Sequence, residues 1–132
     1  MLLGKQAHES YATVQVNANA SVSSSFELIY MLHDRLSQEL ETLRFAIEKQ
    51  DYELKARSSQ KAIDILIGLD SALDTESEEE LVQRIHTLYE HGVATIFQAS
   101  KELDAEAINT LNNVMEDLKQ GWSAVLGWTK SE

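Results

Sequence analysis

The sequence contains no cysteine and no proline, and only five glycines among its 132 residues. Without cysteine the chain can form neither a disulfide nor a thiolate metal site, and this composition suits a reducing cytoplasm. Without proline, and with little glycine, few positions interrupt a helix. The composition therefore predicts long helices joined by short polar segments, and the length fits one domain with a substantial core.

Basic side chains are also scarce: the sequence has 11 of them and 22 acidic ones, so the formal net charge is −11. Such a chain repels phosphate backbones and anionic lipid surfaces, so no nucleic acid partner is expected. The sequence has no apolar segment of membrane-spanning length and does not begin with a secretory signal. We expect a soluble, cytoplasmic protein that does not insert into a membrane.

Motifs for catalysis are missing as well. None of the four histidines has a glutamate three residues earlier, which is the signature of di-iron bundles. His86 and His91 are five residues apart and so lie on different faces of a helix, unlike a metal-binding pair. The chain contains no phosphate-binding loop and no nucleophile elbow. The sequence therefore predicts a protein that is not an enzyme, with no catalytic residue, metal site or cofactor.

Two helices are predicted in the first half of the chain. The first begins near an N-cap at Ser24 or Ser25 and runs to about Lys49. The second follows an N-cap at Asp51 and runs to about Leu73. Each helix carries apolar residues three and four positions apart, which places them on one face; these are Leu36, Leu40, Leu43 and Ile47 in the first, and Ala62, Leu66, Leu69 and Leu73 in the second.

Two further helices are predicted in the second half. One follows the acidic joint LDTESEEEL and runs to about Lys101, and Asp104 caps the last. Short joints force successive helices to lie antiparallel, so we predict an all-α fold, an antiparallel up-and-down four-helix bundle. The bundle is expected over residues 23–128, with a flexible N-terminal segment at 1–22 and a tail at 129–132.

Three of the predicted helices carry more apolar residues than one core needs. In the first helix only Glu27 is polar between Phe26 and Leu32, so apolar side chains point almost all the way round. A groove for an amphipathic helix of another chain would require such an excess. The residues that lie off the main apolar stripes are Phe26, Tyr30, Ile63, Ile67, Val82, Val93 and Phe97.

Several short segments, in their order along the chain, carry a resemblance to a known family. These segments are YATVQV from Tyr11, SSFELIYMLHDRL, KAIDILIGLDSALD, LVQRIHTLYEH and LKQGW. Together they resemble the flagellin-specific export chaperone family, FliS. The family pattern Leu-Ile-x-Met-Leu-Tyr-Asp-Gly opens its first long helix. This chain matches it at Leu28, Ile29, Met31, Leu32 and Asp34, and departs from it at His33 and Arg35.

The resemblance implies a cytoplasmic export chaperone. Similar proteins bind the disordered C-terminal segment of flagellin, prevent premature polymerisation and aid delivery to the flagellar export apparatus. Flagellar export or regulatory proteins are further partners that the resemblance implies. Tyr11 matches the early tyrosine of the family, whose N-terminal segment acts as a cap or contact for the groove. The expected flagellin-binding residues are Tyr11, Phe26, Tyr30, Ile63, Ile67, Val82, Val93 and Phe97.

Two other functions remain open from the sequence. A histidine phosphotransfer domain is also a small four-helix bundle, and His33, His86 and His91 are candidates for its phosphorylated residue. None of them begins the sequence pattern His-x-x-Lys-Gly that is usual in such domains. The other alternative is a self-associating bundle with a structural role, in which the off-stripe apolar residues meet in a homodimer.

Overall fold

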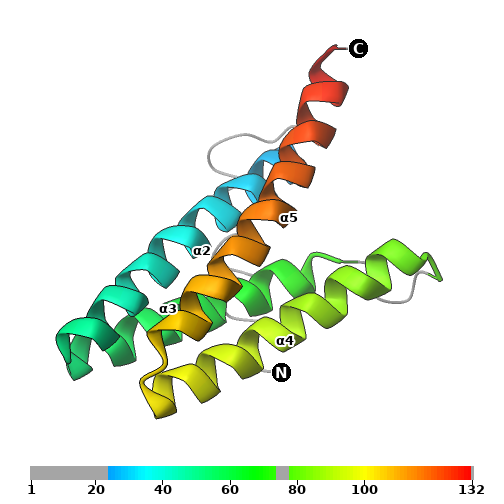
Figure 1. The fold of residues 1–132 in the computed structure, drawn as a ribbon. Helices are drawn as coiled ribbons and strands as arrows, with labels where there is room; N and C mark the ends of the chain where they lie inside the picture. The colour runs from blue at the N-terminus through cyan, green and yellow to red at the C-terminus, as the bar shows by residue number, and fades with distance from the viewer. Residues whose placement is uncertain (1–23, 74–77, 132) are drawn as a thin grey trace.

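The computed structural model describes residues 24–73 and 78–131, with side chains described for residues 26–73 and 78–122. This part of the chain forms four α-helices and no strand: α2 (Ser24–Lys49), α3 (Tyr52–Ser71), α4 (Glu80–Glu102) and α5 (Ala105–Ser131). The predicted all-α four-helix bundle is confirmed (Figure 1). The expected N-terminal segment, including Tyr11, lies outside the described residues.

Both predicted aspartate caps are present. The Asp51 carboxylate accepts a hydrogen bond of 3.1 Å from the backbone N–H of Leu54 at the start of α3. The Asp104 carboxylate accepts one of 3.0 Å from the backbone N–H of Ala107 at the start of α5. Each cap satisfies a backbone donor that has no partner within its helix. These two caps fix where α3 and α5 begin.

Two residues other than glycine adopt the left-handed conformation at the same joints. Gln50 has a φ of 59° after α2, and Leu103 has a φ of 58° after α4. This conformation usually favours glycine, because a Cβ atom makes it costly. Here backbone hydrogen bonds offset that cost, since Asp51 N–H donates to Ala46 at 2.9 Å and Asp104 N–H donates to Ala99 at 2.9 Å. Each joint therefore reverses the chain within two residues.

The helices are arranged as two pairs that meet at one end. Figure 1 shows α2 beside α5 and α3 beside α4, with the α2–α3 and α4–α5 joints at the same end of the molecule. We call this end the closed end. From there α4 and α5 diverge, and α4 contacts α5 much less extensively than α2 does. The opposite end, where α2 and α4 begin and α3 ends, is called the open end.

The core contains buried side chains from all four helices. Leu36, Leu40 and Leu43 of α2 are completely buried, as the apolar stripe predicted. Ile63 is also buried, with 5% of its surface exposed, and belongs to this core. Its expected position outside the core is therefore wrong: α3 packs against both α2 and α4, so its buried face is wider than one stripe.

Candidate polypeptide-binding surface

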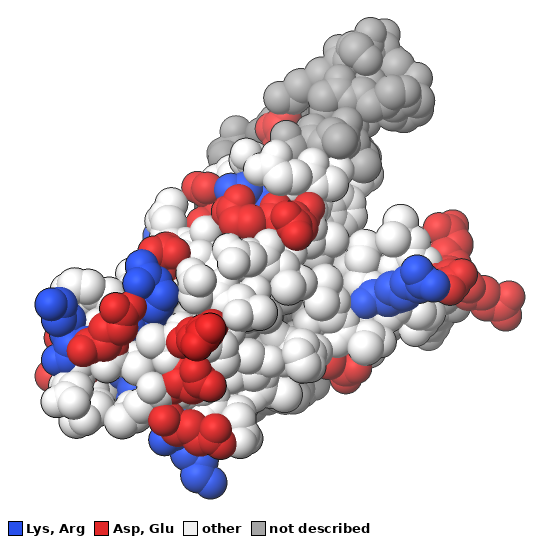
Figure 2. Space-filling view, in the orientation of Figure 1, with Lys and Arg blue, Asp and Glu red and all other residues white. Residues whose placement is uncertain are grey.

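Half-buried apolar side chains gather at the open end of the bundle. They pack against the core but remain partly accessible, because diverging helices cannot cover them completely. In Figure 2 the V-shaped opening between α5 and α4 is bordered mainly by uncharged residues where its atoms are described. We define the open-end surface as Leu28 and Ile29 of α2, Ile67 and Leu73 at the end of α3, Leu88 of α4, and Leu118 and Trp122 of α5.

Helix α5 covers part of the side of α2 that was expected to be bare. The ring of Phe26 lies 5.7 Å from the ring of Trp122, centroid to centroid. The Lys119 ammonium lies 5.7 Å from the centroid of the Tyr30 ring, within the range of a cation–π contact. Both Phe26 and Tyr30 are half-buried. They therefore border the open-end surface and contact α5 at the same time.

A buried polar pair lies at the inner end of the opening. Nε2 of His33 on α2 is 2.7 Å from the hydroxyl oxygen of Tyr89 on α4, and both side chains are almost completely buried. Burial, together with the nearby Lys119 charge, lowers the pKa of His33 to about 4. Burial also raises the pKa of the Tyr89 hydroxyl, and the Trp122 indole opposes this rise. At neutral pH both side chains are therefore uncharged.

Lys119 is the buried cation of this region and is held by two carboxylates. Its ammonium lies 3.0 Å from Glu116 on the same helix and 3.5 Å from Asp34 on α2. The hydrogen bond between Lys119 and Glu116 raises the pKa of Lys119 and lowers that of Glu116. The ammonium thus joins α5 to α2 beside the His33 and Tyr89 pair. Its positive charge is already paired with the carboxylates of Glu116 and Asp34.

His86 joins α4 to α3 near the open end. Its Nδ1 is 2.6 Å from an Asp70 carboxylate oxygen, and its Nε2 is 3.2 Å from a Glu90 carboxylate oxygen. The hydrogen bond with Asp70 raises the pKa of His86. The first turns of α4 are therefore held to α3 by an ion pair whose strength depends on the protonation of this histidine.

The other expected binding residues in the described part of the chain belong to α3 and α4. Hydrogen bonds from the Ser59 hydroxyl to the Ser100 hydroxyl, at 3.2 Å, and from Lys55 to the Ser100 carbonyl, at 3.0 Å, align the two helices. We define the α3–α4 face as Val93 and Phe97 of α4 together with Ile67 of α3, which it shares with the open-end surface. Ile67 and Val93 are half-buried, whereas 63% of Phe97 is exposed. Val82 is half-buried as well, nearer the open end of α4.

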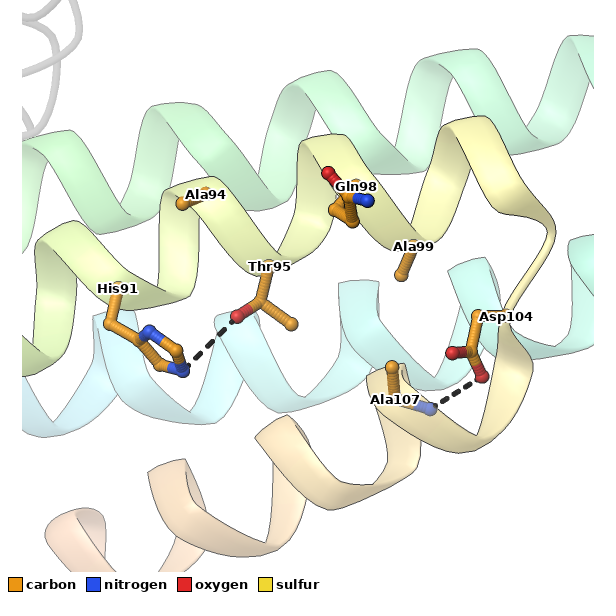
Figure 3. A pocket seen from close by; sticks show the side chains of 7 residues that line it. All are labelled: His91, Ala94, Thr95, Gln98, Ala99, Asp104 and Ala107. Atoms are coloured by element: carbon orange, nitrogen blue, oxygen red, sulfur yellow. Dashed lines mark hydrogen bonds between the residues drawn. The ribbon is translucent and has the colours of Figure 1, made fainter.

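A shallow depression lies between α4 and the start of α5, near the closed end. Figure 3 shows His91, Thr95 and Asp104 at its border, and its volume is about 290 Å³. Its floor is apolar. The polar side chains already interact locally. The Thr95 hydroxyl oxygen is 3.3 Å from Nε2 of His91, and the Asp104 carboxylate caps α5. The lining residues are His91, Ala94, Thr95, Gln98, Ala99, Asp104 and Ala107, a set that suits an apolar contact better than catalysis.

The described residues show no cluster of three or more histidine, aspartate or glutamate side chains that could hold a metal ion. Within the same residues no helix combines the length and apolar character needed to cross a membrane. Of the three histidines considered for phosphotransfer, His33 is buried against Tyr89 and His86 lies between two carboxylates. Those surroundings disfavour an incoming phosphoryl group at either histidine.

Several open-end residues have the helical spacing that is typical of core residues. Leu88, Leu118 and Trp122 follow the same helical spacing as the buried residues, so their period gives no sign that they are accessible. Their accessibility arises because α4 and α5 diverge toward the open end. A hydrophobic period shows which face of a helix is apolar, but it does not show how far the neighbouring helix lies from that face.

Comparison with known proteins identifies the family. The family model described as flagellar protein FliS matches residues 7–127. The flagellar secretion chaperone FliS of Salmonella typhimurium is 29% identical over 118 residues, which cover 89% of this chain and 87% of that protein. FliSB of Pseudomonas aeruginosa is 28% identical over 120 residues, with coverage of 91% and 95%. FliS of Escherichia coli is 29% identical over 119 residues, with coverage of 89% and 88%. Because the match extends over most of its length, this chain belongs to the flagellar protein FliS family.

Proposed function

We propose that the chain is a cytoplasmic chaperone for flagellin. It binds the disordered C-terminal segment of flagellin, prevents premature polymerisation and aids delivery to the flagellar export apparatus. Membership of the FliS family, whose relatives are named flagellar secretion chaperones, supports this proposal. The proposed activity is binding and needs no catalytic residue.

The open-end surface is the observation that carries the proposal. Its side chains are apolar, come from all four helices and stay partly accessible. An amphipathic helix of a partner can bury its apolar face in such a groove. A segment that becomes ordered on binding loses conformational entropy, so an extended apolar surface is needed to offset that loss.

The α3–α4 face offers a second contact area. Among the described aromatic residues of the expected set, Phe97 is the most accessible, and Val93 on the same helix is half-buried. A client segment long enough to wrap the bundle can contact both the open-end surface and this face. Phe26, Tyr30 and Val82 extend the contact at the open end, and Tyr11 is proposed to contact or cap the groove. Ile63 contributes to the core beneath this area.

Binding of purified flagellin tests the proposal directly. The chain is mixed with full-length flagellin and with flagellin that lacks its C-terminal segment, and each mixture is analysed by size-exclusion chromatography with light scattering. We expect a complex with full-length flagellin only, and slower seeded polymerisation of flagellin when the chain is present. Equal binding to the truncated flagellin would show that the C-terminal segment is not the recognised part.

The same measurement separates a chaperone from a self-associating bundle. Exposed Phe97 and the half-buried open-end residues could meet those of a second copy in the absence of a client. Light scattering of the free chain reports such a dimer. A dimer that persists at the same mass when flagellin is added would favour the structural role instead.

A further inference from the structure

The first turns of α4, at the open end, are held in place by few contacts. Leu81 is 67% exposed, and Arg84 pairs with a glutamate of its own helix. Ile85 is buried, and Nδ1 of His86 contacts a carboxylate oxygen of Asp70 on α3. The position of these turns therefore depends largely on Ile85 and His86.

Both ring nitrogens of His86 face carboxylates. Nδ1 is 2.6 Å from Asp70 on α3, and Nε2 is 3.2 Å from Glu90, one turn further along α4. A carboxylate only accepts hydrogen bonds, so each contact needs an N–H on the ring. A neutral imidazole has one N–H, whereas the imidazolium has two. The geometry therefore favours the charged form, in agreement with the raised pKa of His86.

The end of α3 lacks a positive charge of its own. Asp70 lies in the last turn of this helix, and that turn contains no basic residue. The carboxyl end of a helix carries a partial negative charge, so an acidic side chain there is unfavourable unless a cation is close. His86 supplies this cation from α4. Its contact with Asp70 thus stabilises the end of α3 and attaches α4 to it.

The opposite side of α4 faces the opening. Leu88 follows His86 by two residues, which is about 200° round the helix, and Leu81 lies on the same side as Leu88. Across the opening, Leu118 and Trp122 of α5 are half-buried. Movement of α4 toward α5 would bury apolar surface on both helices, which is favourable. The contact of His86 with α3 opposes this closure.

We propose that His86 is a positioning residue, whose contact with Asp70 holds the first turns of α4 against α3 and keeps the opening accessible to a client segment. This inference rests on the proposed function. When the contact is lost, Leu81 and Leu88 approach α5, and the opening is closed in a fraction of the molecules. Apparent affinity for the client then falls in proportion to the fraction that stays open.

The contact should weaken as the pH rises. The raised pKa of His86 means that the folded chain binds its proton more tightly than the unfolded chain does, so the contribution is complete below about pH 6.5. It is lost as the pH rises through the pKa of the folded state. Asp70 on α3 and Glu90 on α4 are the charged groups that act on His86 in the described part of the chain. Carboxylates generally remain ionised above about pH 6, so the imidazole is the group whose charge changes.

Two substitutions separate the charge of His86 from its size. His86→Asn places an amide N–H near the position of Nδ1, so it keeps a hydrogen bond to Asp70 without the charge, and its helix propensity is similar. His86→Lys keeps a positive charge at every pH of the experiment. His91→Asn is the matched control, because His91 is an exposed histidine on the same helix that contacts Thr95. Circular dichroism confirms that each variant is folded.

Affinity is measured by fluorescence anisotropy with a labelled peptide of the flagellin C-terminal segment, at about pH 6 and about pH 8.5. We expect the unaltered chain and His91→Asn to bind about three- to fivefold more weakly at the higher pH. His86→Asn should bind weakly at both values, and His86→Lys tightly at both. Titration of the peptide itself is common to all four proteins, so the differences between them report His86.

The width of the opening is measured without a client. The chain has no cysteine, so spin labels can be attached at Arg84→Cys on α4 and Gln120→Cys on α5, two exposed positions on the helices that border the opening. Addition of His86→Asn to this labelled pair should produce a population with shorter distances between the labels. Raising the pH should produce the same population in the labelled chain that keeps His86.

Three results would overturn the inference and leave the proposed function intact. They are unchanged distances between the labels, a His86→Asn protein that binds with the affinity and pH dependence of the unaltered chain, and a His86→Lys protein that binds as weakly as His86→Asn. If the unaltered chain does not bind the peptide at either pH, the proposed function itself fails. The label distances still test the position of α4 in that case, because they are measured on the free protein.

Discussion

Gly92 on α4 lies so close to Leu66 on α3 that a Cβ atom at Gly92 would be 3.1 Å from Cδ1 of Leu66. The same Cβ atom would lie 3.2 Å from Cε of Met115 on α5. Glycine normally weakens a helix interior by about 1 kcal/mol relative to alanine. Its presence here allows α3, α4 and α5 to approach one another closely.

The effect of substituting Gly92 on stability should depend sharply on the size of the new side chain. The two nearest atoms are ends of flexible side chains and can move a few tenths of an ångström, so Gly92→Ala gains helix propensity and should change stability by less than about 1 kcal/mol. Gly92→Val adds bulk that cannot be accommodated in this way and should destabilise by about 1 to 3 kcal/mol. Urea unfolding followed by circular dichroism measures both values. Equal stability of the two variants would show that the contact is not tight.

Phe97 should contribute more to binding than to folding. It is 63% exposed, so truncation removes little buried area from the free protein. If it anchors the client, Phe97→Ala should weaken binding of the flagellin C-terminal peptide by about 1 to 3 kcal/mol. Isothermal calorimetry measures the affinity, and chemical unfolding measures the stability.

Leu111→Ala is the control for Phe97→Ala. Leu111 of α5 is 4% exposed and belongs to the core, so its truncation should cost about 2 to 5 kcal/mol of stability. The folded fraction of this variant should still bind the peptide normally. A Phe97→Ala protein that unfolds readily but binds with unchanged affinity would remove Phe97 from the proposed binding surface.

The helical architecture could be predicted from sequence because it depends on local chemistry. The period of Leu36, Leu40 and Leu43 gives the buried face of α2, and Asp51 and Asp104 supply a side-chain acceptor at each cap. The positive φ values of Gln50 and Leu103 were not predictable in this way. Neither residue type favours that conformation, which is held by backbone hydrogen bonds that exist only after the helices have formed.

The candidate surface was predicted less completely, because exposure depends on the distances between helices. Phe97 and Val93 were expected to lie off the apolar stripe, and in the structure Phe97 is exposed and Val93 is half-buried. Ile63 has a similar displacement but is buried, since α3 has helices on two sides. The contact between His33 and Tyr89 joins residues 56 positions apart, and no local pattern in the sequence indicates it.

Acid should destabilise the fold through His33. Its pKa is lowered from 6.5 to about 4 in the folded state, so between these values the unfolded chain binds more protons. This contribution to stability is therefore complete above about pH 6.5 and is lost as the pH falls toward 4. The loss from this residue should be about 2 kcal/mol at pH 5. Urea unfolding at pH 7.5 and pH 5 measures it.

His33→Gln separates this effect from other titrating groups. Glu116 has a lowered pKa and also loses stabilisation in acid, whereas His86 has a raised pKa and loses its contribution as the pH rises. These groups are also present in the variant, so the difference between the two proteins reports His33 together with its interaction with Glu116. The variant should lose less stability between pH 7.5 and pH 5. Equal losses would mean that protonation of His33 does not oppose folding.

Deletion of residues 1–19 should reveal how the N-terminal segment acts. The segment contains Tyr11, Val14 and Val16, and we expect it to cover apolar surface until flagellin displaces it. A cap of this kind lowers apparent affinity by the fraction of molecules in which the groove is closed. The deletion should therefore speed association with a flagellin C-terminal peptide in stopped-flow measurements and increase self-association of the free protein. Faster dissociation without faster association would instead indicate a clamp on the bound client, and unchanged rates in both directions would assign the segment no part in binding.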